Sequence, residues 1–139
     1  MSLYKQFKTD PNYESQGITL EYGNTPNGKP IRIKIARAGG SNAKFLKALE
    51  IKSKPYRRQL QNETIDPKIA DDILMQVFVD SVILDWENVE DENGTALPFN
   101  RENCLKLFRD LPDLFADVRE QASRSALFRA EIKESATKN

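Results

Sequence analysis

The side chains that most often carry out enzyme chemistry are scarce in this sequence. None of its 139 residues is histidine, which removes the commonest general base, the Ser-His and Cys-His nucleophile pairs and the HExxH zinc site. Cys104 is the single cysteine, so an intrachain disulfide and a thiolate metal cluster are excluded, and we interpret it as a small buried apolar group. Adjacent carboxylates such as Asp71 and Asp72 lie in polar stretches, not in the apolar surroundings that a catalytic acid needs. We therefore expect a protein that is not an enzyme and uses no metal or cofactor.

Two loops contain the glycines that ligand-binding loops require, but at the wrong spacing. Gly39 and Gly40 precede an expected helix, yet neither GxxxxGK[ST] nor GxGxxG is present, so we interpret them as a flexible joint. In the acidic loop 86–99, placing Gly94 at position 6 of an EF-hand puts Val89 at position 1 and Asn100 at position 12. Neither residue can replace the acidic ligands that calcium needs there. The second loop is therefore predicted to be a turn.

The N-terminal part of the chain has the pattern of strands. Residues 18–22 and 31–35 alternate apolar and polar side chains, and residues 23–28 between them are rich in turn formers. This pattern predicts a β-hairpin over residues 17–37. Two strands alone are marginal and need a further strand, a helix or a second molecule. Residues 1–16 are interpreted as a possible mobile arm.

The rest of the chain has the pattern of helices. Asp66 and Pro67 are typical of a helix start, and ten of the fourteen residues 73–86 are large and apolar, which predicts a core helix within 66–86. The β-branched residues of its second half leave a strand there as the alternative. Asn100 is expected to cap a helix over 100–110, and another helix is expected within 112–135. We predict one domain, 1–139, of mainly α (α+β) fold, with a helical part over 41–135 and a small N-terminal β-hairpin.

Charge is distributed unevenly although the net charge is zero. Residues 1–70 carry 13 basic and 6 acidic side chains, whereas residues 71–139 carry 8 basic and 15 acidic ones. We expect copies of the chain to associate through these halves, although two solvated faces of one fold are the alternative. The expected basic face is Arg32, Lys34, Arg37, Lys54, Arg57 and Arg58, and the expected acidic face is Asp85, Glu87, Glu90, Asp91 and Glu92.

A nucleic-acid-binding accessory protein is the alternative function. The basic half, interleaved with Phe45 and Tyr56, offers phosphate contacts and stacking groups. However, the sequence pI is near 6.3, and no helix-turn-helix or RNA-binding signature is present. The longest nearly apolar run is too short to cross a bilayer, and the N-terminus lacks the apolar region of a signal peptide. We therefore expect no nucleic acid and no membrane as partner, and a cytoplasmic location.

Several strings together resemble a known family. They occur in the same order over most of the chain, from Tyr4–Phe7 to the C-terminus. These strings are ARAGG (36–40), KPYRR (54–58), WENVEDENGTALPFNREN (86–103), LFRDLPDLFADV (107–118) and ALFR (126–129). In this respect the chain is similar to the tail assembly chaperones of long-tailed, non-contractile bacteriophages.

The resemblance implies a protein of the host cytoplasm during virion assembly that is not part of the mature virion. It would keep the tape measure protein soluble and help to recruit tail tube protein, as a homo-oligomer forming a spiral or ring. The family commonly makes a longer product by a translational frameshift, to which tube recruitment is linked, and this chain would be the short form. The family supplies no invariant functional residue that could be transferred to this sequence.

Overall fold

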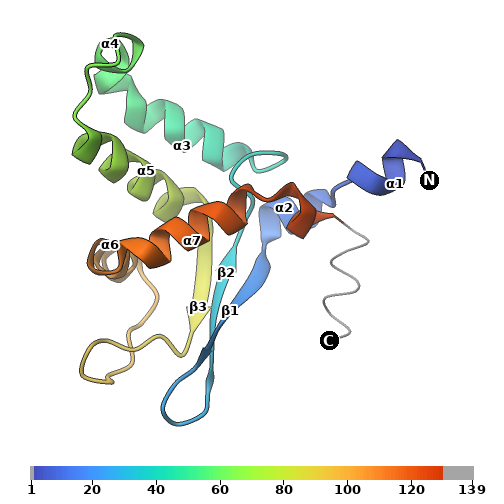
Figure 1. Ribbon diagram of the computed structural model, residues 1–139, viewed down its shortest axis with the longest axis vertical. Helices are drawn as coiled ribbons and strands as arrows, with labels where there is room; N and C mark the ends of the chain where they lie inside the picture. Colours follow the sequence, from blue (N-terminus) through green and yellow to red (C-terminus); the bar gives the residue numbers. More distant parts are fainter. Residues whose placement is uncertain (1, 130–139) are drawn as a thin grey trace.

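The structure, a computed structural model, describes residues 2–129 (Figure 1). Its strands are β1 (Ile18–Asn24), β2 (Pro30–Ile35) and β3 (Ile83–Glu87). Its helices are α1 (Leu3–Phe7), α2 (Pro11–Gln16), α3 (Ala43–Ser53), the 3-10 helix η1 (Lys54–Tyr56), α4 (Arg57–Gln61), α5 (Pro67–Ser81), α6 (Arg101–Asp110), α7 (Pro112–Ser123) and the 3-10 helix η2 (Ser125–Phe128). The expected α+β class, with a helical core and a small sheet, is confirmed.

The sheet contains the expected hairpin and one further strand. β1 pairs antiparallel with β2, with Ile18 opposite Ile35 and Leu20 opposite Ile33. β3 pairs antiparallel with the other edge of β2, which gives the order β1-β2-β3. The predicted need of the hairpin for a further element is met by this third strand. One face of the sheet lies on the core, and the other carries charged side chains.

The expected core helix is confirmed only as far as Ser81. Asp66 caps α5 by accepting a hydrogen bond from the Lys68 backbone N–H at 2.9 Å. At the other end the Ser81 hydroxyl donates to the Val77 carbonyl at 2.6 Å, and residues 83–87 continue as β3. The prediction that the helix could extend to Trp86 is wrong there. The alternative of a strand in the second half is correct only from Ile83 onward, because the β-branched residues Val77 and Val79 belong to α5. The open edge of β2 supplies the backbone partners that this segment takes instead of helical ones.

Aromatic rings join the helices of the core. Phe78 of α5 is buried and packs edge-on against Phe45 of α3 at 5.7 Å and against Phe115 of α7 at 5.6 Å between ring centroids. Arg101 and Arg109 of α6 form ion pairs with Asp80 and Asp72, at 2.7 and 3.0 Å. Asp72 and Asp80 of α5 are therefore both paired with basic side chains of α6.

The two ends of the described chain lie together. The Asp10 backbone N–H donates to the Phe128 carbonyl at 2.8 Å, and Thr9 pairs with Arg129 as a short antiparallel bridge. The chain is thus tied to the fold at residues 9 and 10, and Glu14 of α2 is 2% exposed. The last helix, expected within 112–135, ends at Ser123 because Arg124 adopts an extended conformation. Its expected part over 130–135 lies outside the described residues.

Candidate functional site

Four residues of the expected faces lie side by side on the outer face of one sheet: Arg32, Lys34, Asp85 and Glu87. Arg32 contacts Glu21 and Glu87, each at 3.3 Å, and these hydrogen bonds raise the pKa of the guanidinium. Lys34 stands opposite Asp85 in the β2–β3 register. Arg32 and Glu87, which we had placed on opposite faces of two molecules, thus meet within one molecule.

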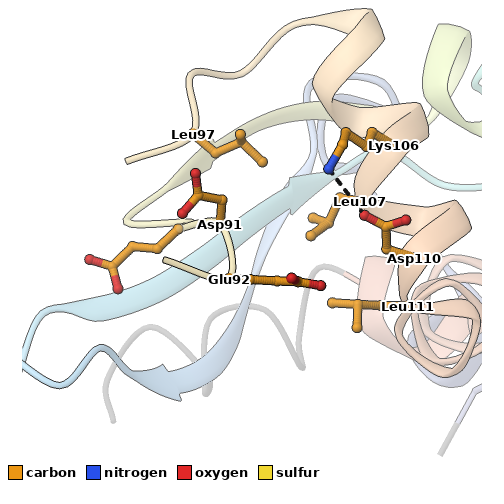
Figure 2. Close-up of a pocket in the computed structure, with 8 residues that line it drawn as sticks. Asp91, Glu92, Leu97, Lys106, Leu107, Asp110 and Leu111 are labelled. Carbon is orange, nitrogen blue, oxygen red and sulfur yellow. Dashed lines mark hydrogen bonds and ion pairs between the residues drawn. The ribbon is translucent and has the colours of Figure 1, made fainter. Parts of the chain in front are cut away.

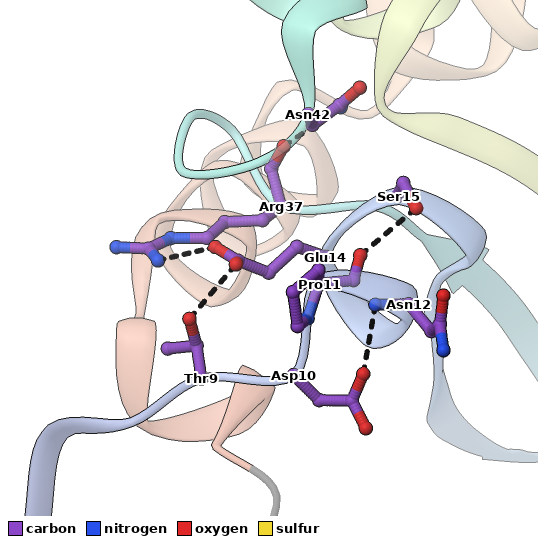
Figure 3. Close-up of polar contacts among 8 residues, drawn as sticks. All are labelled: Thr9, Asp10, Pro11, Asn12, Glu14, Ser15, Arg37 and Asn42. Atoms are coloured by element: carbon purple, nitrogen blue, oxygen red, sulfur yellow. Dashed lines mark hydrogen bonds and ion pairs between the residues drawn. The ribbon is translucent and has the colours of Figure 1, made fainter. Parts of the chain in front are cut away.

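Arg37 is used inside the fold (Figure 3). Its guanidinium donates to the Glu14 carboxylate at 2.5 Å, and the Thr9 hydroxyl donates to the other carboxylate oxygen at 2.9 Å. Burial acts to raise the pKa of Glu14, but the hydrogen bonds, from Arg37 above all, outweigh it and lower that pKa. A Cβ at Gly40 would clash with this carboxylate, so a side chain there would require the Glu14 carboxylate to shift. Arg37 therefore anchors α2 within the fold.

The expected flexible joint before α3 is held in place. Asn42 occupies the N-cap position of α3, but its side chain makes no capping bond. Its amide nitrogen instead donates to the Arg37 carbonyl at 2.9 Å and to the Ser81 carbonyl at 3.0 Å. The buried amide ties the 38–42 loop to the end of α5, so the joint is less free than its glycines suggested.

The remaining basic residues form a separate surface, which we call the basic tip and define as residues 43–61. It comprises α3, η1 and α4, and α4 lies at the end of the helical arm farthest from the sheet (Figure 1). Lys54, Arg57 and Arg58 are exposed there, and none of them takes part in an ion pair found within residues 2–129. The tip exposes three large apolar side chains as well: Leu46 (59%), Ile51 (58%) and Leu60 (40%).

The acidic loop and α6 enclose a hollow that we call the acidic pocket (Figure 2). Its volume is about 220 Å³, and it is lined by Glu90, Asp91, Glu92, Leu97, Lys106, Leu107, Asp110 and Leu111. Lys106 forms an ion pair with Asp110 at 3.3 Å. Three leucines thus lie within a rim that is mainly acidic, a composition suited to apolar side chains accompanied by positive charge.

The loop that forms the pocket wall has the predicted turn. The Asp91 carboxylate accepts hydrogen bonds from the backbone N–H groups of Asn93 and Thr95, both at 2.9 Å, and Gly94 has a φ of 79°. One oxygen of the Asp91 carboxylate is therefore engaged by the backbone of its own turn. Across residues 2–129 no cluster of three potential ligands could hold a metal ion.

Cys104 is buried on α6, as expected. Burial, and secondly the charge of Asp80, raises the pKa of its thiol to about 12. The reactive thiolate is therefore scarce at neutral pH, and the residue serves packing.

Two features of these surfaces escaped the sequence reasoning. One is the set of leucines in the acidic pocket. Their only sequence signal is that Leu107, near the end of the expected helix 100–110, and Leu111, directly after it, are four residues apart. The other is α1, where Leu3, Tyr4 and Phe7 are 72%, 84% and 61% exposed. Leu3 and Phe7 are four residues apart, which is a helical spacing. The interpretation of this segment as an arm left that signal unused.

Comparison with known proteins gives one family. No curated protein and no solved structure matches the chain. Within the described part of the chain, no helix is long and apolar enough to span a membrane. The family model described as YdaY prophage protein matches residues 40–139, which include the basic tip, the core helices and the acidic pocket. The chain is thus a phage-derived protein and belongs to the YdaY prophage protein family.

Proposed function

We propose that this prophage protein is a tail assembly chaperone. It binds the tape measure protein, keeps it soluble in the host cytoplasm and helps to recruit tail tube protein, mainly through a longer frameshifted form. It acts as an oligomer of identical copies, without catalysis, and does not enter the mature virion. The basic tip carries this proposal, since its apolar and cationic side chains suit an amphipathic helix with acidic flanks.

The shape of the tip supports this assignment. A hollow of about 190 Å³ is lined there by Glu50, Ser53, Lys54, Arg57, Leu60 and Gln61. α3 has no fully buried residue, although Phe45 contacts Phe78 on the α5 side. A contiguous apolar patch on a monomer often marks a protein interaction site. We propose that the exposed apolar side chains of the tip act as such a patch, for which a long helical client offers the complementary apolar stripe.

Co-expression with the tape measure protein of the same prophage tests the proposal. Wild-type protein is expected to raise the soluble fraction of the tape measure protein and to elute with it in size-exclusion chromatography. The double variant Leu46→Ser/Ile51→Ser should lose most of this effect, because both side chains are exposed at the tip. A tape measure protein that stays insoluble beside folded wild-type protein would contradict the proposal.

A matched control removes exposed apolar groups elsewhere. Leu3→Ser/Phe7→Ser alters two side chains of similar exposure on α1 and should leave the binding of one chaperone copy to the tape measure protein intact. The nucleic-acid alternative is tested with generic duplex DNA at low salt. That function requires binding that weakens steeply as salt rises, whereas we expect no retardation at physiological salt.

A further inference from the structure

The short helix α1 displays apolar side chains that the described fold leaves exposed. Leu3 and Phe7 are four residues apart and share one helix face, and Tyr4 beside them is 84% exposed. The Arg129 guanidinium lies 5.0 Å from the Phe7 ring centroid, yet Phe7 remains 61% exposed. Lys5 and Lys8 add positive charge to the same segment.

The acidic pocket has the complementary composition. Leu97 and Leu107 are half-buried, and Leu111 is 49% exposed. Around these leucines stand Glu90, Glu92 and Asp110. The pocket thus offers apolar contact for leucine and phenylalanine side chains, with carboxylates at its rim for the lysines that flank them.

Within one molecule the helix and the pocket cannot meet. In Figure 1, α1 projects at one side of the molecule, whereas α6 lies at the opposite side. The chain is also held directly after α1, because Thr9 pairs with Arg129 and the Asp10 N–H bonds to the Phe128 carbonyl. A second copy of the chain is therefore the occupant that fits.

We propose that α1 of one copy docks in the acidic pocket of the next. Leu3 and Phe7 insert between the pocket leucines, and Lys5 and Lys8 face Glu90 and Glu92. The helix and the pocket are different surfaces, so the contact is heterologous and repeats as a ring or an open spiral. This inference rests on the self-association in the proposed function and specifies the contact, but it does not depend on the tape measure protein.

Sedimentation velocity over a range of concentrations tests the apolar part of the contact. Wild-type protein should associate, and Leu3→Ser/Phe7→Ser and Leu111→Ser should each weaken the association at least tenfold. Leu46→Ser/Ile51→Ser removes similarly exposed side chains from the basic tip and should leave it unchanged. The inference would be overturned if Leu3→Ser/Phe7→Ser left association unchanged, or if Arg57→Glu/Arg58→Glu weakened association more than Leu3→Ser/Phe7→Ser does. Self-association itself would not be contradicted by either result. A wild-type protein that stays monomeric would contradict both the α1–pocket contact and self-association. The solubility of the tape measure protein would still test the chaperone activity separately.

A charge exchange tests orientation. Lys5→Glu/Lys8→Glu gives α1 the same sign as the pocket, and Glu90→Lys/Glu92→Lys gives the pocket the same sign as α1. Each variant alone should associate more weakly than wild type at low salt. An equimolar mixture should recover association, because each α1 then faces a pocket of opposite charge. Lack of recovery with both variants folded would contradict the proposed pairing.

Trp86 provides a direct readout of the pocket. It is the single tryptophan, and its indole N–H donates to the carbonyl of Leu97, a pocket residue, at 2.8 Å. A peptide of residues 2–10, which has no tryptophan, should change the Trp86 fluorescence of Leu3→Ser/Phe7→Ser protein in a saturable manner. The same peptide with serine at positions 3 and 7 is the control. Identical curves for the two peptides would overturn the inference.

Discussion

Glu14 is the most deeply buried acidic side chain of the described fold, and its sequence context gives no sign of this. It lies in a polar stretch of the N-terminal segment, and its partner Arg37 is 23 residues away. Only the folded chain brings the two charges together. Local patterns indicate which residues are charged, but the partner of a buried charge depends on long-range packing.

Replacing Glu14 with Gln should destabilise the protein by about 1–3 kcal/mol at pH 7, because Arg37 and Thr9 lose their ionised acceptor. The pKa of Glu14 is lowered from its ordinary 4.5, so its stabilising effect is complete above 4.5. It is lost as the pH falls through the lowered pKa of the folded protein. The difference between wild type and variant should therefore shrink below pH 4.5 in urea unfolding curves. Glu21→Gln, which alters an exposed carboxylate, should change stability much less.

Replacing Gly40 with Ala should cost more than the same change at Gly23. Both residues have positive φ, 55° and 76°, so each substitution incurs left-handed strain of about 1 kcal/mol. At Gly23 nothing lies within 4 Å of the added Cβ, whereas at Gly40 the Glu14 carboxylate would be 1.8 Å away. Thermal melts of the two variants give the comparison, and equal losses would mean that the carboxylate moves aside freely.

The end of α5 shows why helix and strand were confused. Ile83 and Trp86 are both buried and three residues apart, a spacing that is typical of a helix face. In β3 the spacing arises because the register shifts between Lys34 and Ile35, so that Ile83 stands opposite Ile35 and Trp86 opposite Ile33. This irregularity in the strand pairing therefore places buried residues three positions apart, as they would be in a helix. The caps at Asp66 and Asn100 were predictable because each depends on contacts within three residues.

Phe78→Ala tests the packing of α5 against α3 and α7. Phe78 is 3% exposed and contacts the rings of Phe45 and Phe115, so we expect a loss of about 3–5 kcal/mol in the free energy of unfolding. Phe45 is only partly buried, and Phe45→Ala should cost less. A loss below about 1 kcal/mol for Phe78→Ala would place this ring outside the cooperative core.

Across the whole molecule, the sequence indicated the charged runs but not their partners. Arg32 and Glu87 are expected on the surfaces of two molecules because they belong to the basic and acidic halves of the chain, yet adjacent strands bring them together although they are 55 residues apart. The sequence shows the acidic run 90–92, and the structure adds Leu97, Leu107 and Leu111, which together with this run form a pocket. Alternation predicts one strand at a time, whereas the assembly of a surface depends on the order of strands and helices.

The contact between the two ends of the chain carries the last prediction. Phe128 is 0% exposed, and its carbonyl accepts the Asp10 N–H, so it fixes the point from which α1 projects. Phe128→Ala should leave a cavity and cost about 3–5 kcal/mol, and limited proteolysis should then cut near Lys5 and Lys8 faster than in wild type.

If α1 docks in the acidic pocket of the next copy, loosening its base should weaken assembly without altering the pocket. Folded Phe128→Ala protein, at a temperature well below its melting point, should associate more weakly than wild type in sedimentation velocity. It should still bind the peptide of residues 2–10 with unchanged affinity, as judged by Trp86 fluorescence. Weaker peptide binding would instead indicate that the substitution disturbs the pocket itself. The expected weakening has a physical reason, because a freely tethered segment pays an ordering cost on binding that a fixed segment avoids. Unchanged association would therefore show that α1 does not need a fixed base.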